Sequence, residues 1–182
     1  MVSLSFALFK TPIGSCGLVW GASGLVGVLL PEASAVATRA RARLRFGGAH
    51  EAEAPSDIRQ VMVRIVGLLS GERDGLQDIA LDTSALPLFN LRVYELARGI
   101  LPGQTLTYGD VAARIGEPQA ARAVGQALGA NPFPIIVPCH RVLAAGGRSG
   151  GFSAPGGART KLRLLEIEGA PLGAGPGLFD GV

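Results

Sequence analysis

The most constraining feature of the chain is the proline-rich segment 131–142, which reads Asn-Pro-Phe-Pro-Ile-Ile-Val-Pro-Cys-His-Arg-Val. Proline fixes its own φ angle and pushes the residue before it towards extended geometry. Because the residues between the prolines are apolar, we expect a stiff, buried arm that presents Cys139 at its end. Successive residues of an extended chain point to opposite faces, so contact of His140 with the Cys139 sulfur requires a bridging water or a turn.

Cys139 and His140 together indicate nucleophilic catalysis. A thiol with a pKa near ~8.5 is only a few per cent ionised at neutral pH, so it needs a partner that takes or balances its proton. Histidine is the usual partner. For an isolated Cys-His pair, a buried structural cysteine beside a structural histidine is the simpler interpretation. The proline-rich setting favours catalysis.

The composition limits the partners of the chain. Its 182 residues, of which 48% are hydrophobic and 17% charged, suffice for one large domain or two small ones. The net charge of +3 arises in residues 85–182, which hold nine basic and six acidic side chains, against eight of each in residues 1–84. This mildly basic field permits nucleic acid as a partner without requiring it.

The chain has only two cysteines and two histidines, which are Cys16, Cys139, His50 and His140. Their spacing gives no disulfide framework and no zinc site, so we expect no metal and interpret Cys16 as a buried structural residue. No signal-peptide pattern or apolar stretch of transmembrane length occurs in the sequence. A free working thiol suits a reducing compartment. We therefore expect a cytoplasmic protein that does not bind membranes.

The first half is predicted to be a small α/β scaffold without chemistry. Apolar runs separated by turns predict an antiparallel meander and one further strand, and segments with one apolar side predict helices. Alternating arginines in the first helix spread around its cylinder, which favours a solvated surface. His50, in a predicted linker at 47–55, receives no role. The predicted strands are 2–9, 17–20, 24–30 and 78–81, and the predicted helices are 31–46 and 56–70.

After a predicted joint at 82–87, the second half is expected to be helical. Two short helices around the turn at 116–118 have the outline of a helix-turn-helix, although two ordinary packed helices explain the spacing equally well. A Gly/Ser-rich loop at 146–157 is suited to a lid or a pocket wall. The predicted helices are 88–99, 107–115, 119–128 and 159–169, and a Gly/Pro-rich tail is expected over 170–182.

The helix predicted at 119–128 has unusually small side chains. Ala121, Ala123 and Gly125 surround a single long cation, Arg122. A helix that reads the major groove is expected to carry several side chains that bond to base edges. Small side chains instead let the backbone approach a narrow groove and leave one arginine free to enter the duplex. Tight packing in a core is the alternative, and Arg122 in the middle of the helix disfavours it.

Several motifs follow one another in order over residues 88–169. They are Tyr-Gly at 108–109, Arg-Ala-Val-Gly at 122–125, Asn-Pro-x-Pro at 131–134, Pro-Cys-His-Arg-Val at 138–142 and Lys-x-x-Leu-Leu-x-x-Glu-Gly at 161–169. This set resembles that of the O6-alkylguanine-DNA alkyltransferases, also called methylated-DNA–protein-cysteine methyltransferases. The resemblance implies a ribonuclease-H-like α/β domain over 1–84. It also implies a helical C-terminal domain over 85–182 with a minor-groove helix-turn-helix.

The resemblance further implies irreversible transfer of an alkyl group from O6-alkylguanine in duplex DNA to Cys139, after base flipping. By matching position, His140 would act through a water and be oriented by Glu168. No cofactor and a monomeric state are implied, whereas activity on O4-alkylthymine and cooperativity on DNA stay open. The remaining implied roles are the active-site turn for Asn131, rotation of the nucleotide and proton donation for Tyr108, and the finger that replaces the flipped base for Arg122. DNA contact is implied for Ala121, Ala123 and Gly125, and pocket walls for Leu128, Pro134, Phe152, Ser153 and Lys161.

Two departures from the family pattern concern the range of alkyl groups. Phe152 stands where many members have tyrosine, and the glycine-rich loop is two residues longer around Ala154 and Pro155. The chemistry itself needs an ionised sulfur, in-line placement and a proton for the leaving guanine, but no oxyanion hole. The thioether product resists hydrolysis, so one turnover is expected. The alternatives are a lesion-binding relative without transfer, a cysteine hydrolase with a Cys-His-Glu triad, and a helix-turn-helix regulator.

Overall fold

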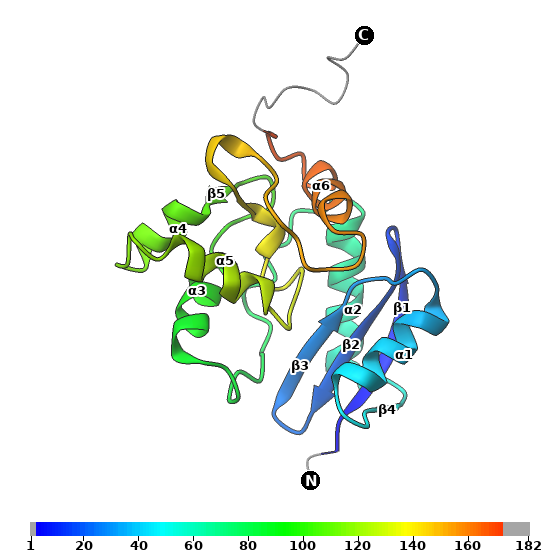
Figure 1. Cartoon of the computed structure of the whole chain (residues 1–182). Coiled ribbons are helices and arrows are strands. Elements are labelled where there is room, and N and C mark those ends of the chain that lie inside the picture. The colour runs from blue at the N-terminus through cyan, green and yellow to red at the C-terminus, as the bar shows by residue number, and fades with distance from the viewer. Residues whose placement is uncertain (1–2, 173–182) are drawn as a thin grey trace.

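The predicted antiparallel meander forms the larger sheet of the molecule (Figure 1). A computed structural model of the chain describes residues 3–172, so most of the tail predicted at 170–182 lies outside the described residues. Gly14 and Gly24 open the second and third strands with φ angles of 126° and 122°, which only glycine adopts readily. The strands are β1 (Ser5–Thr11), β2 (Gly14–Gly21) and β3 (Gly24–Leu29).

Two strand predictions in this half were wrong. The segment predicted as a linker contains a fourth strand, β4 (His50–Glu51), which pairs in parallel with β1. Two residues are too short to show an alternating pattern. The segment predicted as a strand at 78–81 forms only an isolated bridge between Leu81 and Leu25. The single ladder bond there, from the Asp82 N–H to the Leu25 carbonyl at 2.7 Å, does not extend into a strand.

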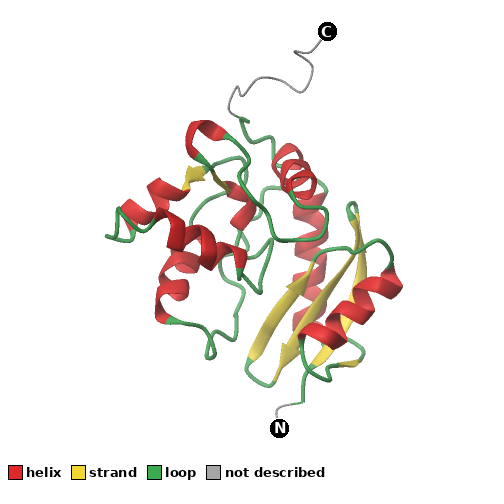
Figure 2. Cartoon of the chain, viewed as in Figure 1, coloured by secondary structure: helices red, strands yellow, loops and turns green. Residues whose placement is uncertain are grey.

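Helices cover both faces of this sheet (Figure 2). The helices α1 (Ala35–Arg45) and α2 (Ser56–Leu69) confirm the two predicted segments. The N-cap residue of α2 is Pro55, and no side chain caps this helix. Adjacent strand residues enter different clusters: Leu18 packs in the main core with α2, and Val19 packs in a smaller core beneath α1. Burial on both faces explains why β2 is apolar in a continuous run.

The second half is helical, as predicted. The α4 helix begins with a capping box, in which the Thr107 hydroxyl accepts from the Asp110 N–H at 3.0 Å and Asp110 accepts from the Thr107 N–H at 2.8 Å. The α4 and α5 helices pack on each other and on α3. The helices are α3 (Leu88–Arg98), α4 (Tyr108–Arg114), α5 (Ala121–Gly129) and α6 (Ala158–Ile167).

A second, two-stranded sheet joins the proline-rich segment to the start of α4. Its strands, β5 (Leu106–Thr107) and β6 (Val142–Leu143), are parallel. A 3-10 helix, η1 (Cys139–Arg141), leads into β6, and another, η2 (Ala145–Gly147), follows it. None of these short elements was predicted, because two or three residues carry no periodicity.

The two halves meet at the edge of the larger sheet. One edge strand of this sheet is β3, and its Val28 N–H donates to the Pro132 carbonyl at 2.8 Å. The proline-rich segment thereby uses an edge group that would otherwise be unpaired. One core cluster includes Val28 from the sheet and Val93, Ile135 and Val137 from the second half. Across residues 3–172, no helix has the length and apolar character to cross a membrane.

Candidate active site

The proline-rich segment is buried as predicted, but it is not an extended arm. It makes a tight turn in which the Val137 N–H donates to the Phe133 carbonyl at 2.8 Å, and Ile135 has a φ of 76°. A branched residue at positive φ is strained, which typically costs ~1–3 kcal/mol. A proline restricts the residue before it, and Ile135 precedes no proline, so the turn occurs at this position. The turn delivers Cys139, which is 8% exposed, at the start of η1.

The Asn131 side chain holds this turn closed. Its Oδ1 accepts from the Phe133 N–H at 2.8 Å, and its Nδ2 donates to the Val137 carbonyl at 2.9 Å. Both bonds are buried, where an unpaired polar group is costly. The amide of Asn131 therefore stabilises the strained backbone that positions Cys139.

Behind Cys139 lies a buried network centred on Glu168. The Glu168 carboxylate accepts from His140 Nε2 at 2.8 Å and from Arg141 at 2.9 and 2.7 Å, and the three side chains are at most 3% exposed. Arg141 also donates to the Ile100 carbonyl at 2.6 Å. Burial alone would raise the pKa of Glu168, but the bonds from His140 and Arg141 lower that pKa to about 2. Glu168 is therefore an ionised acceptor.

This network fixes the protonation of His140. Burial lowers the pKa of His140, so its imidazole is neutral at pH 7, despite the opposing effect of Glu168. An ionised carboxylate can only accept, so Nε2 carries the proton and Nδ1 has a free lone pair. The Nδ1 atom is buried and has no hydrogen-bond partner within the described residues. It is available to take a proton.

The Cys139 thiol needs such an acceptor. Burial raises the pKa of Cys139, and the Asn131 side chain and the Lys161 ammonium only partly oppose this rise. Cys139 therefore rests as a neutral thiol. Cys139 and His140 both lie in the 3-10 turn η1, and the backbone N–H of His140 contributes to lowering the pKa of the Cys139 thiol. The His140 imidazole bonds to Glu168 through Nε2, so a water between Nδ1 and the Cys139 sulfur stays a prediction.

Lys161 is fully buried beside the thiol. Its Nζ donates to the Val142 carbonyl at 2.7 Å and to the Tyr108 hydroxyl at 3.5 Å. Burial lowers the pKa of Lys161 to about 8, although the nearby Cys139 opposes this shift. The ammonium is thus predominantly charged at pH 7. It connects β6 to Tyr108, and its charge acts on Cys139.

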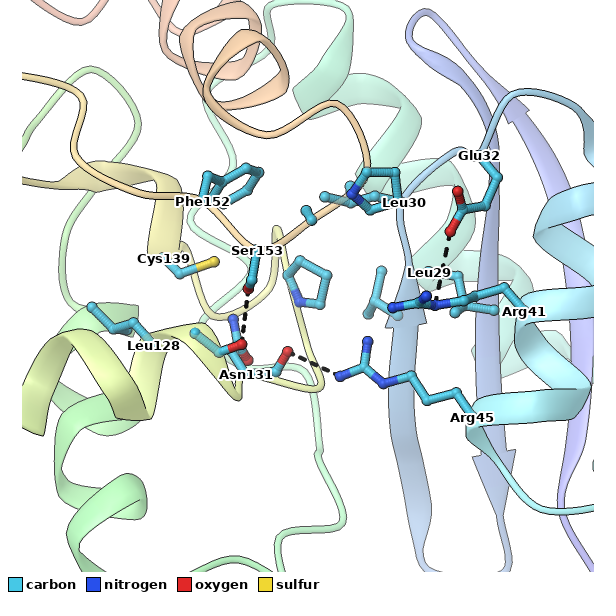
Figure 3. A pocket seen from close by; sticks show the side chains of 15 residues that line it. Leu29, Leu30, Glu32, Arg41, Arg45, Leu128, Asn131, Cys139, Phe152 and Ser153 are labelled. Carbon is cyan, nitrogen blue, oxygen red and sulfur yellow. Dashed lines mark hydrogen bonds and ion pairs between the residues drawn. The ribbon is translucent and has the colours of Figure 1, made fainter.

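Two cavities share Cys139. The large cavity, of about 560 Å³, opens towards α5 and is lined by Tyr108, Ala121, Arg122, Gly125, Leu128, Cys139, Phe152 and Ser153, among others. The small cavity, of about 180 Å³, lies between the two halves (Figure 3). It is lined by Leu128, Asn131, Pro134, Cys139, Phe152 and Ser153 and, from the first half, by Glu32, Arg41 and Arg45.

The structure brings most of the predicted site residues together. Arg122 is exposed on α5 at the large cavity, and the Ser153 hydroxyl donates to the Gly129 carbonyl at 2.8 Å. Ala123 lines neither cavity. The alternating arginines of α1, predicted to be solvated, are Arg39, Arg41, Arg43 and Arg45. Of these, Arg41 and Arg45 are exposed but also line the small cavity. Within residues 3–172, no group of three His, Cys, Asp or Glu side chains is arranged to hold a metal ion.

The sequence did not reveal the role of Arg141 or the approach of α1. Arg141 is part of the Pro-Cys-His-Arg-Val motif, so the motif itself could have marked Arg141 as a site residue. Arg45 contacts the Asn131 carbonyl at 3.5 Å across 86 positions of sequence, and no local pattern predicts that contact.

Comparison with known proteins connects these features to a family. The family model described as 6-O-methylguanine DNA methyltransferase, DNA binding domain, matches residues 88–170. A methylated-DNA–protein-cysteine methyltransferase of Methanothermobacter thermautotrophicus is 33% identical over 161 residues, covering 88% of this chain and 83% of that protein. A DNA base-flipping protein of Thermus thermophilus is 38% identical over 145 residues, covering 80% of this chain and 95% of that protein. The crystal structure of Mycobacterium tuberculosis OGT in complex with DNA matches with a TM-score of 0.70 and 33% identity, covering 92% of this chain and 95% of that chain.

Proposed function

Since the chain belongs to the methylated-DNA–protein-cysteine methyltransferase family and repairs DNA by alkyl transfer, we propose that Cys139 accepts the alkyl group. The observation that carries this proposal is the position of the sulfur. Cys139 lies where the large cavity meets the buried His140–Glu168 pair. Cys16, the other cysteine, is fully buried within strand β2, and burial raises its pKa to about 12.

The proposed substrate is O6-alkylguanine in duplex DNA, with O4-alkylthymine as a second base to test. His140 Nδ1 takes the Cys139 proton through a water, and Glu168 stabilises the resulting imidazolium. The thiolate attacks the alkyl carbon, the S–C bond forms as the C–O6 bond breaks, and the electron pair stays on guanine. Tyr108, held by Lys161, donates the proton that guanine then takes. The thioether is stable, so each chain reacts once.

The walls of the pocket support this assignment. Leu128 and Pro134 offer apolar surface beside the sulfur, and Phe152 lines both cavities. The Ser153 hydroxyl lines both cavities and is suited to form a hydrogen bond with the polar edge of guanine. With phenylalanine at 152, the pocket lacks a hydroxyl there. No cofactor takes part in the proposed reaction.

For DNA binding, we propose that α4 and α5 act as a helix-turn-helix in the minor groove. The small residues Ala121, Ala123 and Gly125 allow close approach of the α5 backbone. Arg122 is exposed at the rim of the large cavity and is suited to fill the gap left by a flipped base. Its intrusion would offset an unstacking cost of a few kcal/mol.

The finer assignments of fold and state are also proposals. We assign residues 1–84 to a ribonuclease-H-like domain and residues 85–182 to a DNA-binding and alkyl-transfer domain. The sheet with α1 and α2 on its faces, and the change to helices after α2, support this division. Two free thiols suit the cytoplasm. We propose that the free protein is a monomer. Light scattering without and with a duplex tests this and shows whether several chains assemble on DNA.

Mass spectrometry after incubation with a duplex containing O6-methylguanine tests the central proposal. One methyl group per chain should appear on Cys139, and the lesion should disappear. Cys139→Ala should abolish transfer while retaining DNA binding, and Cys16→Ala should keep transfer. An unmodified Cys139 with the lesion still in the DNA would contradict the proposal.

The His140–Glu168 pair beside Cys139 also has the composition of a hydrolase triad. The two functions differ in turnover. A hydrolase would cleave an ester or peptide many times, whereas the proposed transfer consumes the cysteine. Titration of transferred label against protein therefore separates them, with a plateau at one equivalent expected.

A further inference from the structure

The small cavity extends from Cys139 to the first half of the chain. In Figure 3 the Cys139 sulfur points towards the space whose far side is formed by Glu32, Arg41 and Arg45. The near side is formed by Pro134 and Ser153. Leu128, Cys139, Phe152 and Ser153 line both cavities, so the two cavities adjoin at the sulfur and the small one continues from there towards α1.

The far side of the small cavity carries an excess of positive charge. Arg41 and Arg45 are four residues apart on α1, so they share a helix face and repel each other. Glu32 pairs with Arg41 only loosely, at 3.8 Å between Nε and Oε1. Among residues 3–172, Arg45 forms no ion pair, and its hydrogen bond to the Asn131 carbonyl is long, at 3.5 Å. An anion at this point would relieve the repulsion and supply Arg45 with a partner.

We propose that the small cavity is a subsite for O6-alkyl groups that end in a carboxylate. The inference rests on the proposed role of Cys139 and adds a substrate class to it. The reaction is unchanged: the sulfur bonds to the carbon attached to O6, that C–O6 bond breaks, and guanine keeps the electron pair and takes a proton. The rest of the alkyl chain extends from the reacting carbon into the small cavity, and its carboxylate binds Arg45 and Arg41.

The test compares two bases of equal size and different charge. Duplexes carrying O6-carboxybutylguanine or O6-carbamoylbutylguanine are given to the full chain, and single-turnover transfer to Cys139 is followed by mass spectrometry. We expect the carboxylate to react about threefold faster than the amide, which is the range of an exposed ion pair. Since the ratio is measured on one protein at a time, loss of folded protein cancels.

Three variants locate the effect. Arg45→Gln should bring the ratio close to one, and Arg45→Lys, which keeps the charge, should retain most of it. Arg43→Gln is the matched control, because Arg43 is exposed on the same helix outside the cavity and should leave the ratio unchanged.

A ratio of one or less in the unmodified chain, or a ratio that survives Arg45→Gln, overturns the subsite. O6-methylguanine is the internal reference that separates the two levels of the proposal. If methyl transfer occurs without a preference for the carboxylate, only the subsite fails. If no base is transferred, the role of Cys139 fails and the subsite fails with it.

Discussion

Glu168 is the residue on which the stability of the site depends most. It neutralises Arg141, which is 1% exposed, and it also orients His140. Removal of one partner from a buried ion pair typically costs ~3–5 kcal/mol, because the other charge stays buried without compensation. We therefore expect Glu168→Gln to lower the free energy of unfolding by about this amount, measured by urea denaturation.

Glu166→Gln is the matched control for that measurement. Glu166 lies two positions away on α6, is exposed, and pairs only with Arg163 at 3.2 Å. Such surface pairs contribute ~0–1 kcal/mol. Equal losses for the two variants would contradict the buried network described for Glu168.

Lys161 controls the reactivity of the cysteine. Its positive charge lowers the pKa of Cys139 and so opposes the effect of burial. Lys161→Met should therefore raise the pH at which Cys139 reacts with a thiol reagent. The measurement is the pH dependence of alkylation by iodoacetamide in a Cys16→Ala background. Lys10→Met is the control, because it makes the same substitution at an exposed position of a strand. A profile unmoved by Lys161→Met would exclude this electrostatic role.

At the scale of elements, α5 presents Gly125 towards the large cavity. A Cβ atom at this position would meet only the Tyr108 ring, at 3.9 Å, which is an ordinary contact. Gly125→Ala should therefore keep transfer and raise helix stability by ~1 kcal/mol. Gly125→Leu should fold equally well but slow transfer at least tenfold, because the longer side chain enters the cavity between Tyr108 and Phe152.

Single-turnover rates and circular dichroism melting curves measure both effects of the Gly125 variants. The two variants share the loss of glycine and differ in size alone. Equal rates for Gly125→Ala and Gly125→Leu would mean that the base does not pass along this face of α5.

The elements that the sequence predicted are those with repeated patterns. The meander and the helices α1 to α6 each have enough residues for an apolar period or a turn signal to appear. The elements β4, β5, β6 and η1 have two or three residues each, and their formation depends on partners elsewhere in the chain. The strand predicted at 78–81 has an apolar pattern but lacks a neighbouring strand along its whole length.

At the scale of the molecule, the order of the motifs predicted the site residues, but it did not predict the long-range contacts that hold them in place. Cys139, His140 and Glu168 follow from the order of the motifs. The turn at Ile135 does not, because Asn131 and the Val28–Pro132 hydrogen bond hold it against its own conformational preference. Contacts between α1 and the small cavity join segments about ninety positions apart in sequence, and only the folded chain displays them.

The buried site also makes the whole chain sensitive to acid. Burial lowers the pKa of His140 from its ordinary value of 6.5, so the unfolded chain binds more protons than the folded chain once the pH falls below 6.5. Stability due to neutral His140 is therefore lost as the pH falls through this value. Glu168 has a folded pKa of about 2 against an ordinary value of 4.5, so its contribution is present above pH 4.5 and is lost between 4.5 and 2.

Both groups act in the same direction, and the free energy of unfolding should decrease from about pH 6.5 downwards in two overlapping stages. Urea denaturation at a series of pH values measures this slope. His140→Gln should remove the first stage, because the variant has no imidazole to protonate, whereas His50→Gln should keep it, because His50 lies exposed on β4 away from the site. The slope between pH 6.5 and 4.5 could instead be the same in all three proteins. Protonation of His140 would then not cause the loss of stability, and its imidazole would be accessible to protons in the folded state.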